Sequence, residues 1–385
     1  PDLLVSLIAI LFLFLTIKYK RFYYYKNIFF YVFILFYIYL VLNSAFSEYP
    51  IFSLKSSLVY VRFGLFTVAI WFLIDNNPKF LKFFFIWFVV AFIIGLFDGY
   101  YQYFNGKNLF GYIYTNRLNL LTSDQLLLGN YLARTFPLFL ALAILLMGVR
   151  KINYIYIFIL LVLIDVLIYI SGERTALGLM LLSNVFIIFL MSNLRIFRIT
   201  SIIISVLLIS VISVVSPQIK ERNIDTTITQ LGLNDNNTSI NFFSPKHESH
   251  IIPSLRMFQQ KPITGFGPNT FRKYCNDVRF KYNEHSCTTH PHHTISQLLG
   301  EIGLIGIIFF LAVVFYILKV ILFHIKDILL RREKKLDDFQ VCILACFLCT
   351  LWPILPTLNF FNNWISIVYY LPIGFYLHSI YKSSE

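Results

Sequence analysis

Long apolar stretches separated by short polar connections run along most of the sequence. A helix needs about 20 residues to cross the hydrocarbon core of a bilayer, and many of these stretches approach that length. We therefore predict a series of membrane-crossing helices. The predicted spans are residues 3–17, 28–43, 57–74, 80–98, 126–147, 153–170, 175–192, 199–216, 294–322, 338–355 and 360–380.

One long segment, residues 217–293, interrupts this series and is too polar to lie in lipid. The chain thus divides into residues 1–216 with the first eight spans, the polar loop, and residues 294–385 with the last three. Within the loop we predict a helix near residues 253–260, followed by a Pro/Gly turn. The pattern is that of an all-α polytopic membrane protein with about 11 spans and one large loop.

Lysine and arginine gather in alternate connections between the spans. Cytoplasmic connections collect these cations, so this set is predicted to face the cytoplasm. The long loop and the N-terminus then lie on the other side, which for a bacterial inner membrane is the periplasm. An outer N-terminus suits a further span upstream and a native total of about twelve. The predicted cytoplasmic cations are Lys18, Lys20, Arg21, Lys26, Lys79, Lys82, Arg150, Lys151, Arg195, Arg198, Lys326, Arg331, Arg332, Lys334, Lys335 and Lys382.

Composition and charge agree with this reading. Of the 385 residues, 58% are hydrophobic and 13% are charged, far from the values of soluble globular proteins. The net charge of +13 suggests nucleic-acid binding in isolation, but the cytoplasmic connections account for most of the excess. We therefore expect membrane lipids as partners and no nucleic acid.

The cysteines fall in two kinds of surroundings. Cys342, Cys346 and Cys349 lie in an apolar run and are expected to serve packing, whereas Cys275 and Cys287 lie in the polar loop. An oxidising compartment would allow the loop pair to form a disulfide. Two free thiols fit the sequence equally well.

Two arginines are candidates for anion binding. Arg174, in SGERTALGLM, stands where the seventh predicted span begins on the outer side. A cation at such a boundary often only extends its charged group into the water at the membrane surface. A guanidinium also suits bidentate contact with phosphate. Arg256 precedes Gly265 and Gly267 in the loop. Because this GxG follows a Pro-containing turn and no strand, it is not a dinucleotide-binding motif.

Three histidines, His290, His292 and His293, stand just before the ninth predicted span. Three readings are open: a zinc site, a polar start to a helix, and a catalytic or substrate-contacting histidine. Adjacent His292 and His293 point apart in a strand or a helix, which disfavours a shared metal. The third reading is favoured by the residues that follow.

His292, His293, nine further residues and then Gly303-Leu-Ile-Gly306 resemble the signature of the O-antigen ligase family. In that signature a His is followed by Asn, Ser or Gln, nine residues and GxxG, so His293 occupies the amide or hydroxyl position. The family also has about twelve spans, a large periplasmic loop before the motif, and two matching arginines. Arg174 matches the arginine at the outer start of a span, and Arg256 matches the one before a Pro-x-x-Gly-x-Gly turn. O-antigen polymerases and some pilin oligosaccharyltransferases share much of this pattern.

The resemblance implies a GT-C type glycosyltransferase of the inner membrane, without cofactor or metal. The donor would be an undecaprenyl-diphosphate-linked glycan, and the acceptor a lipid A–core sugar for a ligase or a second lipid-linked glycan for a polymerase. His292 would be the base, with Arg174 and Arg256 neutralising the diphosphate. The expected substrate-binding residues are His290, Arg117, Gly265, Gly267 and His293. A polysaccharide transporter or flippase and a non-catalytic assembly protein are the rival readings.

Overall fold

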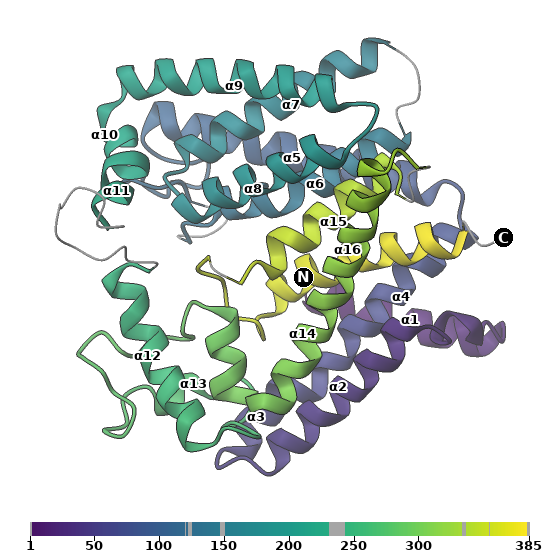
Figure 1. The fold of residues 1–385 in the computed structure, drawn as a ribbon, viewed down its shortest axis with the longest axis vertical. Coiled ribbons are helices and arrows are strands. Elements are labelled where there is room, and N and C mark those ends of the chain that lie inside the picture. Colours follow the sequence, from purple (N-terminus) through teal and green to yellow (C-terminus); the bar gives the residue numbers. More distant parts are fainter. Residues whose placement is uncertain are drawn as a thin grey trace. The chain divides into compact units, whose positions relative to one another are not determined.

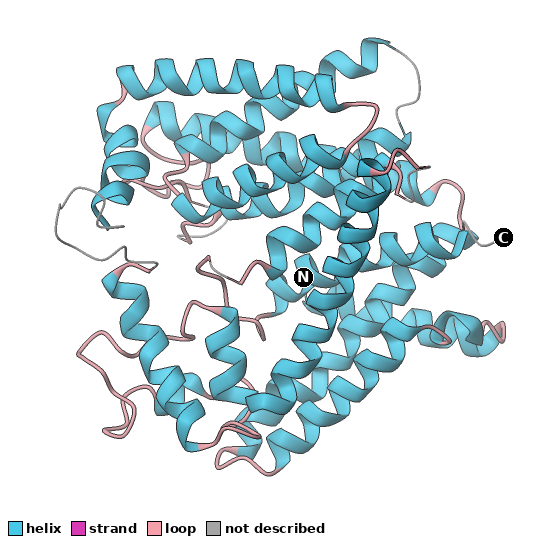
Figure 2. Ribbon diagram, in the orientation of Figure 1, coloured by secondary structure: helices cyan, strands magenta, loops and turns pink. Residues whose placement is uncertain are grey.

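A computed structural model describes residues 2–119, 121, 125–146, 151–230, 243–332, 336–353 and 355–382. These residues form helices joined by loops and contain no strand (Figure 2). By their contacts the residues fall into two compact units, which are described separately. Of the predicted cytoplasmic cations, Arg150, Lys334 and Lys335 lie outside the described residues.

Every predicted apolar stretch coincides with a helix (Figure 1). These helices are α1 (Asp2–Lys18), α2 (Ile28–Ala45), α4 (Val61–Asn76), α5 (Phe80–Asn105), α6 (Leu128–Leu146), α7 (Lys151–Ile170), α8 (Arg174–Leu190), α9 (Arg195–Val215), α14 (Thr294–Leu329), α15 (Asp338–Leu351) and α16 (Asn363–Lys382).

Six helical stretches of the described chain are long and apolar enough to cross a membrane. They are Ile28–Ala45, Pro50–Asn76, Phe80–Asn105, Leu128–Leu146, Arg195–Val215 and Thr294–Leu329. Three shorter apolar helices accompany them, namely Tyr154–Ile170, Arg174–Leu190 and Asp338–Leu351. The protein is thus a helical, multi-pass membrane protein, while the count of eleven spans stays a prediction.

The polar segment after α9 also contains helices, within residues 217–230 and 245–260. The predicted helix near residues 253–260 is longer than expected, because α12 runs from Pro245 to Gln260. Ser244 is extended at its N-terminus and Pro245 takes the first helical position, where a missing N–H costs nothing. Pro253 therefore lies inside the helix and does not start it. The shorter helices of the chain are η1 (Phe22–Tyr25), α3 (Pro50–Ser57), η2 (Leu58–Tyr60), α10 (Pro217–Lys220), η3 (Glu221–Asp225), α11 (Thr226–Gln230) and α13 (Phe271–Tyr274).

Unit 1 comprises Pro1–Asn77, Phe242–Val320 and Trp352–Glu385. Its core lies where α4 packs against α1 and α16. Aromatic rings fill much of that core, and the Tyr24 and Trp71 rings meet edge to face with centroids 4.9 Å apart.

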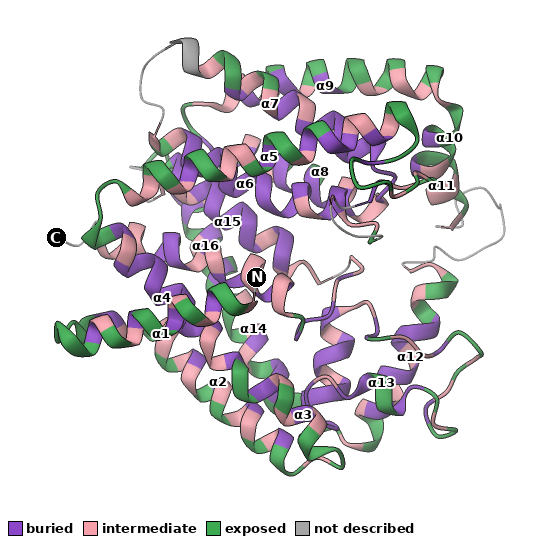
Figure 3. Cartoon of the chain, turned by 180° about the vertical axis from the view of Figure 1, so that it is seen from behind, coloured by how far each residue is buried: buried purple, intermediate pink, exposed green. Residues whose placement is uncertain are grey.

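Unit 2 comprises Pro78–Asn241 and Ile321–Leu351. Its centre is α6, which packs against α5, α7, α8 and α15. Of the most apolar 18 residues of α6, 83% are buried. In α9 only 17% of the corresponding 18 residues are buried, and Figure 3 shows α9 as a largely exposed helix. Because apolar side chains exposed on a membrane protein contact lipid, α9 presents a lipid-facing surface.

Several predicted cytoplasmic cations, among them Lys18, Lys82 and Lys326, lie within helices, and the structure shows one further such cation to be fully buried. Arg198 does not lie in a connection, because α9 already begins at Arg195 and Arg198 is fully buried within it. Its guanidinium pairs with Asp165 of α7 at 2.8 Å and donates to the amide oxygen of Asn184 of α8. A buried guanidinium requires such partners, so Arg198 ties three helices together and is no guide to topology.

Candidate active site

The two glycine motifs of the sequence form one structural unit in unit 1. The turn of residues 262–267 lies along the first part of α14, and four main-chain hydrogen bonds join them. The amides of Phe266 and Gly267 donate to the carbonyls of Gly300 and Glu301, and the amides of Leu304 and Ile305 donate to the carbonyls of Pro262 and Ile263. We call this arrangement the glycine clip.

Glycine is required at the clip because the two main chains approach closely. Gly303 has φ 61° and ψ −164°, a conformation that interrupts α14 and that only glycine adopts readily. A Cβ at Gly303 would lie 2.4 Å from the carbonyl oxygen of Ile263, and one at Gly265 would lie 2.5 Å from the carbonyl carbon of Glu301. Gly265 and Gly267 were expected to bind substrate, and the structure places both in contact with protein main chain or serine side chains.

A buried carboxylate, missed in the sequence, fixes the end of the same turn. Glu301 of α14 is fully buried and accepts hydrogen bonds from the amides of Asn269 and Phe271, at 3.0 and 2.8 Å. Gln297, one helical turn earlier, donates to Glu301 and to Asn359. The first turns of α14 are therefore held by main-chain and side-chain bonds together.

His293 caps the N-terminus of α14. Its Nδ1 accepts from the amide of Ser296 at 3.2 Å, the bond that a capping side chain makes to the third helical residue. Its Nε2 lies 2.7 Å from the carbonyl oxygen of Pro353, which can only accept, so the proton is on Nε2. Asn and Ser are the residues most often found at such a cap, which explains how His293 fills the amide or hydroxyl position of the motif. Both ring nitrogens of this expected substrate contact are used within the protein.

His292 is held at the centre of a group of four histidines. Its main chain has φ 54°, and its carbonyl accepts from the amide of Thr357 at 2.8 Å. The ring of His290 lies 4.0 Å from it between centroids, and those of His250 and His247 on α12 lie 5.3 and 6.1 Å away. We call these four residues the histidine cluster.

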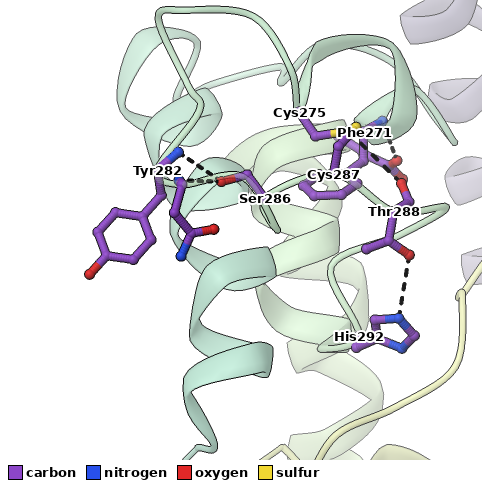
Figure 4. Close-up of a disulfide and its surroundings, with 9 residues drawn as sticks. Phe271, Cys275, Tyr282, Ser286, Cys287, Thr288 and His292 are labelled. Atoms are coloured by element: carbon purple, nitrogen blue, oxygen red, sulfur yellow. Dashed lines mark hydrogen bonds between the residues drawn. A yellow bond between two sulfur atoms is a disulfide. The ribbon is translucent and has the colours of Figure 1, made fainter.

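The surroundings keep the two central histidines neutral. Burial, followed by the neighbouring histidines, lowers the pKa of His292 to about 3, and burial lowers that of His290 to about 4. The Nε2 of His290 is buried without a hydrogen-bond partner. His292 Nε2 is 3.5 Å from the Thr288 hydroxyl, which is a weak contact (Figure 4). A neutral imidazole with so low a pKa is a weak base, which accepts a proton only from a strongly acidic donor.

Cys275 and Cys287 form a disulfide, one of the two outcomes open from the sequence. Figure 4 shows the disulfide beside the loop that leads from Cys287 through Thr288 to His292. Arg256 supports the same loop, because its Nη1 donates to the carbonyls of Phe280 and Lys281. Arg256 therefore has a structural role. This role is compatible with the expected contact to the diphosphate, because both bonds come from Nη1 and the guanidinium has five N–H groups in all.

Unit 2 contains a second group of polar side chains, at the turn between α7 and α8. Arg117 and Arg222 both lie against Gly172, with side-chain carbons 3.3 and 3.5 Å from the position of a Cβ there. Arg222 Nε donates to the Gly172 carbonyl at 3.3 Å, and Arg174 follows two residues later. We call Arg117, Arg174 and Arg222 the arginine cluster. Within the described residues Arg174 makes no hydrogen bond or ion pair, so its guanidinium is unoccupied there.

One buried carboxylate accompanies these three cations. Glu173 accepts from the amide of Gly129 at 2.7 Å and from the side chain of Asn130, and lies 3.4 Å from Arg117. Burial raises the pKa of Glu173 to about 7, although Arg117 and the hydrogen bonds oppose the shift. Even a charged Glu173 leaves the cluster with two uncompensated guanidiniums, which is the electrostatics of an anion site.

The structure groups some of the expected residues and adds others. Arg117 and Arg174 come together in unit 2, while His290, His292 and His293 come together in unit 1 with the clip. The sequence reasoning missed Arg222, Glu173 and Glu301, whose only signal was a charge beside an apolar span or, for Glu301, inside one. In the part of the chain described, no group of three or more His, Cys, Asp or Glu side chains is arranged to hold a metal ion.

Comparison with known families bears on this constellation. Residues 157–311 match the model of the family described as O-antigen ligase. The matched region contains Arg174, Arg222, Arg256, the histidine cluster and the glycine clip, whereas Arg117 lies before it. A search of curated proteins found no match. The match over residues 157–311 supports the O-antigen ligase and polymerase family that the sequence motifs predicted.

Proposed function

We propose that the protein is an O-antigen ligase of the bacterial inner membrane, with a GT-C type fold of about eleven spans in this chain and its site on the periplasmic side. It transfers a glycan from an undecaprenyl-diphosphate donor to a sugar hydroxyl of the lipid A–core. The observation that carries the proposal is His292, a neutral histidine held by its main chain among three other histidines at the start of α14.

The proposed reaction is a single displacement with inversion. The acceptor oxygen bonds to the anomeric carbon of the donor while the bond from that carbon to the diphosphate breaks. The acceptor hydroxyl becomes strongly acidic only as it forms the new bond, so a weakly basic His292 takes the proton late in the step. The departing diphosphate carries the electron pair and needs positive charge more than a proton.

Positive charge for the diphosphate comes from the arginines. Arg174, with a half-buried guanidinium and no internal hydrogen bond within the described residues, is assigned to the phosphate oxygens, and Arg117 and Arg222 supply the surrounding charge. Arg256 is assigned a further phosphate contact. Because guanidiniums supply the neutralisation, the reaction is expected to proceed without a metal ion.

The test is glycan transfer by purified protein from a lipid-linked donor to a core acceptor. We expect His292→Ala to lower kcat by about 10²- to 10⁴-fold, the usual contribution of a general base. His285→Ala is the matched control, because His285 is an exposed histidine of the same loop and should retain activity. Full activity in His292→Ala would refute the mechanism, and loss of activity in a chelator would refute its metal independence.

The second candidate is an O-antigen polymerase, which joins lipid-linked repeat units. The family match includes this activity, and the two differ in the acceptor. A deletion strain distinguishes them: a ligase mutant accumulates lipid-linked polymer and has uncapped lipid A–core, whereas a polymerase mutant caps the core with a single repeat.

A further inference from the structure

A hollow of about 530 Å³ lies in unit 2 at the end of α9, within the size range of small-molecule sites. One wall comes from the last turns of α9 and the other from α10 and η3, because Pro217 ends the helix and turns the chain back. The lining residues are Ile209, Ser210, Ser213, Val214, Pro217, Lys220 and Ile224.

The hollow is apolar despite its two serines. The hydroxyl of Ser210 donates to the carbonyl of Val206, and that of Ser213 donates to the carbonyl of Ile209. Tyr169 also meets the Ser213 hydroxyl, at 2.6 Å. Since these hydroxyls are satisfied within the protein, the serines contribute small carbon surfaces and leave room beside the larger side chains. Hydrocarbon is the ligand chemistry that such walls accept.

The position of the hollow favours a lipid. It opens on α9, the helix whose apolar face is the most exposed of the six membrane-crossing candidates in the described chain. Its one cation, Lys220, is exposed and stands where α9 has already ended. A lysine there can attract an anionic head group while the hydrocarbon lies below it.

The same short helical segment connects the hollow with the arginine cluster. Lys220 and Ile224 are four residues apart and share the face that lines the hollow, whereas Arg222 between them points away. Arg222 donates to the Gly172 carbonyl, and Asn223 donates to the carbonyl of Tyr169 at 2.8 Å. A ligand with an anionic head and a hydrocarbon tail can therefore contact both faces of one segment.

We propose that this hollow binds the part of the donor's isoprenoid tail nearest the diphosphate, with Lys220 at its rim and the diphosphate at the arginine cluster. The inference rests on the proposed function for the identity of the donor. It adds a tail-binding site, and it makes residues 217–225 the element that holds head and tail together.

The test measures binding of undecaprenyl diphosphate and of inorganic diphosphate, which has no tail, to the purified full chain in lipid nanodiscs. Ser210→Trp fills the hollow, and Leu208→Trp is the matched control, because Leu208 is 43% exposed on the opposite face of α9. We expect Ser210→Trp to weaken undecaprenyl diphosphate binding about tenfold, the loss for roughly two methylene groups that are no longer buried. Inorganic diphosphate should bind more weakly to the unmodified protein, and its binding should not change in the variant.

Several outcomes would overturn the proposal. They are equal binding of both compounds by the unmodified protein, equal losses for both in Ser210→Trp, and an equal effect of Leu208→Trp. Full competition by excess phosphatidylglycerol would assign the hollow to ordinary membrane lipid instead. Because the measurement is binding, a protein that binds the long isoprenoid at the hollow but transfers no glycan would contradict the proposed function and leave this inference standing.

Discussion

At the scale of residues, two histidines that are neighbours in the sequence have different environments. His293 has both ring nitrogens bonded to main-chain atoms and begins α14. His292 turns to positive φ and joins the histidine cluster. The sequence predicted that these rings point apart, because adjacent side chains do so in any regular structure. It did not predict that His293 is a helix cap, since that depends on Pro353, sixty residues away.

The neutral state of His292 leads to a prediction on pH. Its pKa is lowered to about 3 by burial, so the neutral base persists well below the ordinary histidine value of about 6.5. We expect kcat/KM for transfer, corrected for unfolded protein, not to fall between pH 7 and about 5, because His292 stays neutral and protonation of Glu173 only adds positive charge at the arginine cluster. Stability behaves differently: the unfolded chain takes up protons near pH 6.5 and the folded histidines do not, so the contribution of these histidines to the free energy of unfolding falls as the pH drops below that value. Glu173 contributes in the opposite direction, because its raised pKa makes the folded protein bind a proton first. An acid limb of kcat/KM centred near 6.5 would contradict the assignment.

Arg222 provides the second prediction at this scale. If it supplies charge to the diphosphate, Arg222→Ala should lower kcat/KM about 10- to 100-fold, somewhat less than the loss of a direct donor to the transition state. Arg222→Lys should recover part of this loss, because lysine restores the positive charge but not the planar guanidinium that binds phosphate oxygens in pairs. Arg279→Ala is the control, since Arg279 is an exposed cation paired with Asp277. Equal kinetics in Arg222→Ala and Arg279→Ala would remove Arg222 from the site.

At the scale of elements, three separate sets of contacts hold the first turns of α14. The glycine clip, Glu301 and the His293 cap all act on this stretch. The sequence alone gave the existence of α14 and the spacing of its glycines, because hydrophobic length and motifs are local. It did not show that residues 262–267 and 300–305 bind each other, which requires contacts between separate segments.

The clip predicts different outcomes for two glycines of one motif. Gly303→Ala places a Cβ against the Ile263 carbonyl in a conformation that costs a non-glycine residue about 1–3 kcal/mol, so the melting temperature should fall clearly. Gly306→Ala is the matched substitution. Its Cβ would meet the side chain of Ile302, whose Cβ lies 2.7 Å away, but Gly306 does not have positive φ and the helix gains propensity, so the loss should be smaller than for Gly303→Ala. Comparable melting temperatures for the two variants would show that the clip does not require glycine.

At the scale of the whole molecule, the sequence predicted the class of fold, a helical membrane protein, while the roles of the site residues stay a prediction. All eleven apolar stretches are helices, because a run of apolar residues long enough to bury itself in lipid forms one whatever its neighbours are. Arg198 shows the limit: a cation near a predicted boundary was assigned to a connection, and its partners Asp165 and Asn184 were invisible in the pattern. Arg222 and Glu301 escaped notice for the same reason.

The glycine clip has a consequence for engineering. The hydrogen bonds between residues 262–267 and 300–305 are made by peptide groups, so most side-chain substitutions should leave them intact. Their pairing depends instead on the number of residues between the glycines. A chimera that exchanges only one of these segments with a relative of different length would shift the register by a peptide unit. Exchanged together as a cassette, with the capping residue His293, they should carry the local geometry of His292 into a new background intact.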